Sequence, residues 1–187
     1  EVIIEIPDCQ LLHPDLLAGA PLAEALAVIG SSRKAELSVS LTLSDAGLDV
    51  SVEGGKPLDG PLRIGLAAWT EQNGVARLSW DGEVIAMRES PGQHFGAARV
   101  VPPPGAFLQA TSEGEAALVA AVQDAVGASA RIADLFSGCG TFALPLAKGA
   151  EVHAVEGDAN MVAALDQVFL ASTRDIGLVL KARLNLF

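Results

Sequence analysis

Residues 131–156, RIADLFSGCGTFALPLAKGAEVHAVE, decide how the rest of this chain is interpreted. The run from Ile132 to Phe136 predicts a short strand, because apolar residues dominate it and only Asp134 interrupts them. The next four residues, 137–140, read SGCG, and two glycines in so short a turn let the backbone approach a ligand closely. The stretch therefore begins as a strand that leads into a glycine-rich turn.

Beyond this turn, the pattern predicts a helix and a second strand. Thr141 to Lys148 is expected to be helical, and Glu151 to Val155 is a strand-like run that ends in Glu156. A strand, a turn that opens a helix and a second strand make the first βαβ unit of a nucleotide-binding sheet. In such a unit an acid in the place of Glu156 can accept both hydroxyls of a ribose. The predicted fold class is α/β.

The position of Asp134 bears on which adenosine cofactor would bind. Gly138-Cys139-Gly140 followed by Ala143 could be a variant of the dinucleotide fingerprint G-x-G-x-x-G/A. However, Asp134 lies inside the first strand, before both glycines. S-adenosylmethionine has no pyrophosphate to cradle, and a carboxylate near the turn favours its cationic sulfonium and amine. The arrangement therefore favours this methyl donor over a nicotinamide cofactor.

Composition indicates a globular chain without a membrane span. Half of the 187 residues are hydrophobic, which is enough for one large domain or two small ones. No apolar run reaches the roughly 18 residues that a span needs. Cys9 and Cys139 make no disulfide framework, which fits a reducing, cytoplasmic compartment. Since the chain opens with Glu1 rather than Met, we interpret it as a piece of a longer protein.

The chain is acidic, with a formal net charge of −11. Residues 1–100 hold 14 acids and 7 bases, and residues 101–187 hold 9 acids and 5 bases. Neither half shows the basic patch that is typical of nucleic-acid-binding proteins. If the whole protein acts on RNA, we expect parts outside these residues to grip the RNA.

Residues 1–100 predict an α+β subdomain whose antiparallel sheet is built from two hairpins and covered by helices on one face. Pro21 is expected to open the first helix and Gly30 to end it. Asp81-Gly82 is a two-residue hairpin turn. The expected elements are a strand over 1–6, a helix over 21–29, strands over 36–43 and 48–52, a helix over 61–72, and strands over 75–80 and 83–87.

The proline run 102–104 is the expected boundary, which gives domains 1–100 and 101–187. Beyond it, a capping box from Ser112 to Glu115 predicts a helix that runs to Val126. A further helix is expected over 158–171, and residues 178–187 could begin a third strand. A doubly wound sheet has about five or six strands, so this part is expected to be the first half of one. Two copies could pair through its exposed sheet.

Three motifs in this order resemble those of the RNA uracil-C5 methyltransferase family. They are Phe107-Leu108-Gln109, the run 134–147 and Val155-Glu156-Gly157, and together they cover about residues 100 to 170. The resemblance implies a class I, Rossmann-like domain that binds S-adenosylmethionine. It also implies methylation of C5 of a uridine, with RNA as the partner of the whole protein.

The resemblance implies cofactor-binding roles along these motifs. The amide of Gln109 would help to hold the cofactor and the target uracil. Phe136 and Thr141 match positions that line the cofactor pocket, although many relatives carry Asn in place of Thr141. The full set of candidate cofactor-binding residues is Gln109, Asp134, Phe136, Gly138, Gly140, Thr141 and Glu156.

No catalytic residue is assigned in this chain. Cys139 is rejected as a nucleophile, because it lies inside the glycine turn, where side chains serve packing. By resemblance, the nucleophile of the family is a Cys that follows a later Asp-Pro-Pro motif, and the sequence contains no such segment. Methylation at C5 needs a thiolate that adds to C6 and a base that removes the C5 proton. The chain alone is therefore predicted to be inactive.

Cys9 has two interpretations. Some family members carry a four-cysteine iron–sulfur site near the N-terminus, and Ile6-Pro7-Asp8-Cys9 resembles its last ligand. One thiolate cannot hold a 4Fe-4S cluster, so the other three ligands would lie before residue 1 in a parent of the ribosomal-RNA type. An ordinary free cysteine is the alternative.

Two other functions stay open on the sequence alone. A small-molecule methyltransferase or a nicotinamide enzyme could use a similar sheet, and ligand preference would separate them. A non-catalytic interaction module is favoured by the acidity and by the missing catalytic segment. Failure to bind any adenosine cofactor would support that module.

Overall fold

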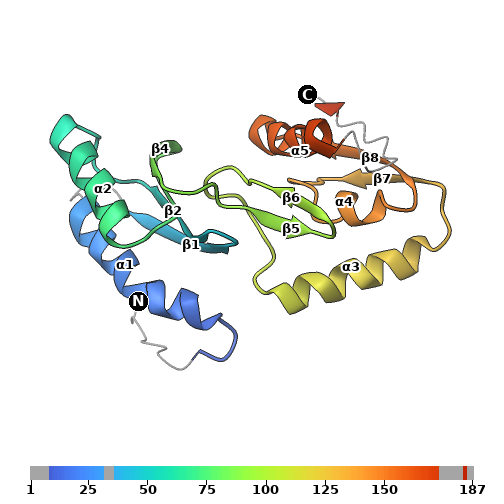
Figure 1. The fold of residues 1–187 in the computed structure, drawn as a ribbon, viewed down its shortest axis with the longest axis horizontal. Helices are drawn as coiled ribbons and strands as arrows, with labels where there is room; N and C mark the ends of the chain where they lie inside the picture. The colour runs from blue at the N-terminus through green and yellow to red at the C-terminus, as the bar shows by residue number, and fades with distance from the viewer. Residues whose placement is uncertain (1–8, 32–35, 173–182, 185–187) are drawn as a thin grey trace. The chain divides into compact units, whose positions relative to one another are not determined.

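The computed structural model describes residues 9–31, 36–172 and 183–184 (Figure 1). The strand predicted over residues 1–6 lies outside them. The chain divides into two compact units, Glu1–Pro91 and Gly92–Phe187, whereas the sequence predicted the division after residue 100. The difference arises because Phe95, Ala98 and Val100 pack in the core of the second unit. No helix among the described residues is long and apolar enough to cross a membrane.

The first unit contains a four-stranded sheet in the order β1-β2-β3-β4. Strands β1, β2 and β4 are labelled in Figure 1. Its strands are β1 (Ser38–Ser44), β2 (Gly47–Glu53), β3 (Arg77–Trp80) and β4 (Glu83–Met87). The predicted hairpins are correct, since β1 pairs antiparallel with β2 and β3 with β4. The middle pair is parallel, so the prediction of a wholly antiparallel sheet is wrong. Helix α2 (Gly60–Gln72) connects β2 to β3 and returns the chain to the same end of the sheet.

Helix α1 (Pro14–Gly30) begins earlier than predicted. His13 caps it, since its Nδ1 accepts a hydrogen bond from the backbone N–H of Asp15 at 3.2 Å. Pro14 occupies the first turn, so Pro21 lies inside the helix instead of opening it. As predicted, α1 and α2 cover one face of the sheet, because Leu26 and Leu66 share a core with the apolar residues of β2 and β3.

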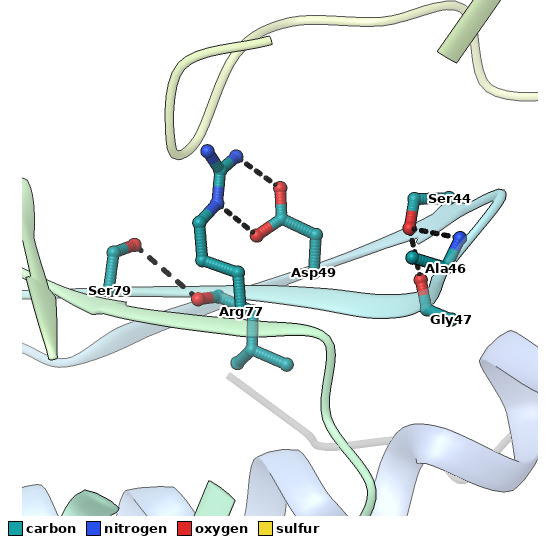
Figure 2. Close-up of polar contacts among 7 residues, drawn as sticks. Ser44, Ala46, Gly47, Asp49, Arg77 and Ser79 are labelled. Atoms are coloured by element: carbon teal, nitrogen blue, oxygen red, sulfur yellow. Dashed lines mark hydrogen bonds and ion pairs between the residues drawn. The ribbon is translucent and has the colours of Figure 1, made fainter. Parts of the chain in front are cut away.

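The opposite face of the two central strands carries a buried ion pair. Arg77 Nε and Nη2 donate to Asp49 Oδ1 and Oδ2 at 2.8 and 2.6 Å (Figure 2). The two residues are direct partners in the parallel register. On the same face, Ser79 Oγ donates to the backbone carbonyl of Val50 at 3.4 Å. These contacts tie β2 to β3 at one specific register.

The second unit opens with a hairpin that the sequence analysis did not predict. Its strands β5 (Gln93–Phe95) and β6 (Ala98–Val100) pair antiparallel. Helix α3 (Ser112–Val126) follows, as predicted, and Gly127 ends it. Its N-cap is Thr111 rather than Ser112, since the Thr111 hydroxyl accepts the N–H of Gly114 at 3.0 Å.

The predicted βαβ unit is confirmed, with a third parallel strand beside it. The sheet order is β7-β8-β9, and both pairs are parallel. The strands are β7 (Arg131–Leu135), β8 (Glu151–Glu156) and β9 (Arg183–Leu184), and the helices are α4 (Ala143–Leu146) and α5 (Ala159–Ser172). The rest of the stretch 178–187 lies outside the described residues. This arrangement is the α/β fold that the sequence predicted.

Helix α4 is shorter than the eight-residue helix predicted over 141–148. Pro145 fits in its first turn, where no helical partner for an N–H is needed. Both α4 and α5 contribute to one core with β8, through Ala143, Val152 and Leu165. On the other face of β7, Leu135 is 63% exposed. The predicted pairing of two copies through this sheet stays a prediction.

Candidate cofactor site

The glycine turn connects β7 to α4 at the carboxyl end of the sheet. Ser137 N–H donates to the Val155 carbonyl at 3.1 Å, and Gly140 N–H donates to the Ser137 carbonyl at 3.0 Å. Gly138 and Gly140 have φ values of 57° and 105°, which favour glycine. A Cβ on Gly140 would lie 2.7 Å from Leu144 Cδ1, whereas a Cβ on Gly138 would meet no atom within 4 Å. Gly140 therefore serves packing, and Gly138 presents its backbone to open space.

Glu156, at the end of β8, accepts hydrogen bonds from the glycine turn and from the residues that precede α5. Its Oε2 accepts the N–H of Gly138 at 2.8 Å, and its Oε1 accepts the N–H groups of Gly157 and Asp158 at 2.7 and 2.9 Å. These hydrogen bonds, that from Asp158 foremost, lower the pKa of Glu156. A carboxylate oxygen has two lone pairs, so Oε2 keeps one for a ligand hydroxyl. A second ribose hydroxyl would have to replace a backbone N–H.

Asp134 lies within β7 and is half-buried. Burial raises the pKa of its carboxyl and the nearby charge of Glu156 raises it further, while a hydrogen bond from the backbone of Ala143 lowers it. Its Oδ2 and the Oγ of Ser137 are buried and have no hydrogen-bond partner within the described part of the chain. Two unsatisfied polar atoms beside one turn mark a place where a ligand or an ordered water belongs.

The remaining predicted residues, Gln109, Phe136 and Thr141, make no hydrogen bond to Glu156 or Asp134 within the described part of the chain. Phe136 has a φ of 61° and is 90% exposed, and a non-glycine residue in this conformation is strained. Gln109, in the segment before α3, and Thr141, after the turn, are both half-buried. Across residues 9–31, 36–172 and 183–184, no hydrogen bond joins either side chain to Glu156 or Asp134. Their cofactor roles stay predictions.

The two cysteines occupy different environments. Cys139 is 1% exposed, and burial raises the pKa of its thiol to about 11, so the thiol is protonated at neutral pH. Cys9 is a free, half-buried thiol before α1. Within the described residues, no three His, Cys, Asp or Glu side chains are grouped to hold a metal ion. The iron–sulfur role of Cys9 stays a prediction.

Asp158 is a residue of the site that the sequence analysis missed. Its N–H donates to Glu156, and its Oδ1 accepts the N–H groups of Asn160 and Met161 at 2.8 and 3.0 Å. It thereby caps α5 and orients Glu156 at once. An Asp directly before a helix is a recognisable N-cap signal. It was missed because the helix was predicted to begin at Asp158 itself, whereas α5 begins at Ala159.

The chain is similar in sequence to RNA methyltransferases. It is 41% identical over 166 residues to an uncharacterised RNA methyltransferase of Mesorhizobium japonicum, over 88% of this chain and 40% of that protein. It is 34% identical over 185 residues to the 23S rRNA (uracil(1939)-C(5))-methyltransferase RlmD of Shewanella piezotolerans, over 89% of this chain and 42% of that protein. This similarity confirms the resemblance that the motifs predicted. No family model matches the chain.

The chain spans about two fifths of the length of the curated relatives it matches. Among solved structures, it is similar to the tRNA (uracil-54, C5)-methyltransferase of Pyrococcus abyssi, which was solved with S-adenosyl-L-homocysteine. The TM-score is 0.67 and the identity 17%, over 99% of this chain and 50% of that one. At this identity the likeness shows a shared fold.

Proposed function

We infer that this chain, a relative of RNA methyltransferases, is the S-adenosylmethionine-binding part of an enzyme that methylates C5 of a uridine, in ribosomal RNA. The observation that carries the proposal is the hydrogen bond between Gly138 and Glu156, which joins the glycine turn to the acid at the end of β8. The sequence similarity to RlmD supports uridine in ribosomal RNA as the substrate of the whole protein.

The residues of the site fit the chemistry of this cofactor. Glu156 would accept a ribose hydroxyl at Oε2, which keeps a free lone pair. Gly138 would let the cofactor lie against the backbone, because nothing occupies the space beside its Cα. Asp134 would place negative charge near the cationic end, since its Oδ2 has no partner in the described chain. The bound cofactor supplies a methyl group activated for transfer to carbon.

We propose that the catalytic nucleophile lies on the part of the protein that these residues do not include. The thiol of Cys139 is buried and its pKa is about 11, so it provides no thiolate at neutral pH. The net charge of −11 also favours RNA binding by parts of the protein outside these residues. If this chain alone released tritium from RNA labelled at C5 of uracil, the assignment of the nucleophile to another part of the protein would be contradicted.

Calorimetric titration with S-adenosylhomocysteine tests the proposal. We expect the chain to bind it and Glu156→Gln to weaken binding by about tenfold or more, because an amide cannot accept three backbone N–H groups. Glu151→Gln is the matched control, since Glu151 is exposed at the start of the same strand. Binding of NAD instead would favour a nicotinamide enzyme, and binding of neither would favour the interaction module.

A further inference from the structure

One face of α3 is turned toward the core of the second unit. Glu115, Val119, Val122 and Val126 are its half-buried residues, and all others in the helix are exposed. Val122 and Val126 pack against the core that includes Cys139 and Leu165. Residues four apart lie above one another on a helix. Glu115 therefore continues the inward face one turn beyond Val119.

Glu115 belongs to the face of α3 that packs against the core containing Cys139, the middle residue of the glycine turn. Its charge contributes to the raised pKa of Cys139, the residue between the two glycines, and burial raises the pKa of Glu115 itself. Its backbone N–H donates to the carbonyl of Thr111 at 3.0 Å. The carboxylate has no hydrogen bond or ion pair with any residue that the structure describes. A partly desolvated carboxylate without a partner is costly, and burial is the cause of the raised pKa of Glu115.

A second observation at the turn indicates that a ligand belongs there. Ser137 is only 4% exposed and its Oγ has no partner among the described residues. Asp134 Oδ2 is unpaired in the same way. Gly138, next to Ser137, faces open space. The turn therefore combines unsatisfied polar atoms with room for a ligand. Glu115 lies on the face of α3 that is turned toward the core containing Cys139.

We propose that Glu115 binds the ammonium group at the amino-acid end of the methyl donor, so that α3 supplies part of the cofactor site. This inference rests on the proposed function. Glu156 already serves the ribose end, and adenine carries no positive charge. The sulfonium has no N–H to donate, whereas an ammonium donates three hydrogen bonds. The ammonium is therefore the group that best satisfies an unpaired carboxylate.

Two ligands that differ only at this end test the inference. S-adenosylhomocysteine carries the amino-acid group, whereas 5′-methylthioadenosine keeps the adenosine and the sulfur without it. We expect Glu115→Gln to weaken S-adenosylhomocysteine binding by about tenfold or more, the loss of one charge-assisted hydrogen bond. The same variant should leave the affinity for 5′-methylthioadenosine unchanged. Glu156→Gln should weaken both.

Glu113→Gln is the matched control, because Glu113 lies in the same first turn of α3 but is exposed. It should leave both affinities unchanged, and Glu115→Asp, which keeps the charge, should retain part of the affinity for S-adenosylhomocysteine. Unchanged S-adenosylhomocysteine binding in Glu115→Gln, or an equal loss for both ligands, would overturn the inference and leave the proposed function intact. If the unaltered chain binds neither ligand, the proposed function fails with it.

Discussion

At the residue scale, Glu156 joins segments that are distant in sequence. Its carboxylate accepts N–H groups from the glycine turn on one side and from the start of α5 on the other. Three backbone donors around one carboxylate favour its ionised form. These hydrogen bonds hold the Glu156 carboxylate in one orientation without a ligand. An incoming hydroxyl group would therefore meet an acceptor that is already oriented.

The hydrogen bonds to Glu156 predict that the stability of the fold depends on pH. Because the pKa of Glu156 is lower in the folded state than in the unfolded state, its contribution is fully present above the unfolded pKa of about 4.3. It is lost as the pH falls through the lowered folded value. Asp134, with a raised folded pKa, acts in the opposite direction, since its cost disappears as it is protonated. Glu156→Gln should reduce the acid sensitivity of thermal unfolding below about pH 5, measured by calorimetry. An unchanged profile would contradict this role of Glu156.

Gly140→Ala should destabilise the second unit. The new Cβ would meet the side chains of Leu144 and Leu165 at 2.7 Å, at a φ of 105° that disfavours any side chain. We expect a loss of about 2–4 kcal/mol in the free energy of unfolding, measured by denaturant titration. Gly149→Ala is the control, because nothing lies within 4 Å of its Cβ position. Equal effects of the two substitutions would argue against the packing role of Gly140.

The two cysteines should differ in reactivity. Cys139 is buried with a pKa of about 11, whereas Cys9 is only half-buried. With a disulfide reagent at pH 8, we expect one fast-reacting thiol in the native chain and two in denaturant. Cys9→Ser should abolish the fast reaction. Fast labelling of Cys139 in the native chain would show that the glycine turn opens.

At the scale of elements, the parallel pair β2–β3 depends on its buried ion pair. Removing one partner leaves the other charge buried, which costs about 3–5 kcal/mol. Arg77→Met should therefore destabilise the first unit strongly in denaturant titrations, and Asp49→Leu in the same chain should recover part of the loss. Arg63→Met is the control, since the pair of Arg63 with Glu83 is exposed. A similar loss of stability in Arg77→Met and in Arg63→Met would show that burial of the ion pair is unimportant.

The sequence predicted most elements but not all of their pairing. The two hairpins of the first unit and the βαβ unit of the second were recoverable from alternation and turn residues, which act over a few neighbours. The hairpin 93–100 was missed because its strands are three residues each, too short for a periodic signal. The parallel middle pair was missed because it joins Asp49 to Arg77 across a helix.

At the scale of the whole molecule, the chain has two cores, one in each unit. Units with separate cores can unfold separately. Both tryptophans, Trp69 and Trp80, lie in the first unit. We expect two calorimetric transitions, of which tryptophan fluorescence reports only one. S-adenosylhomocysteine should raise the temperature of the other transition, and a shift of the fluorescence transition alone would contradict the placement of the site in the second unit.

The sequence alone predicted the strand–turn–helix–strand unit, the two glycines of its turn and the acids that flank them. These features follow from local chemistry, since periodicity, turn residues and glycine conformations depend on adjacent residues. The packed structure was needed to show that Glu156 accepts a hydrogen bond from Gly138, that Asp134 keeps an unpaired oxygen and that Glu115 is on the inward face of α3. These features depend on residues that are far apart in the chain. They also depend on burial, which arises only when the sheet and helices pack together.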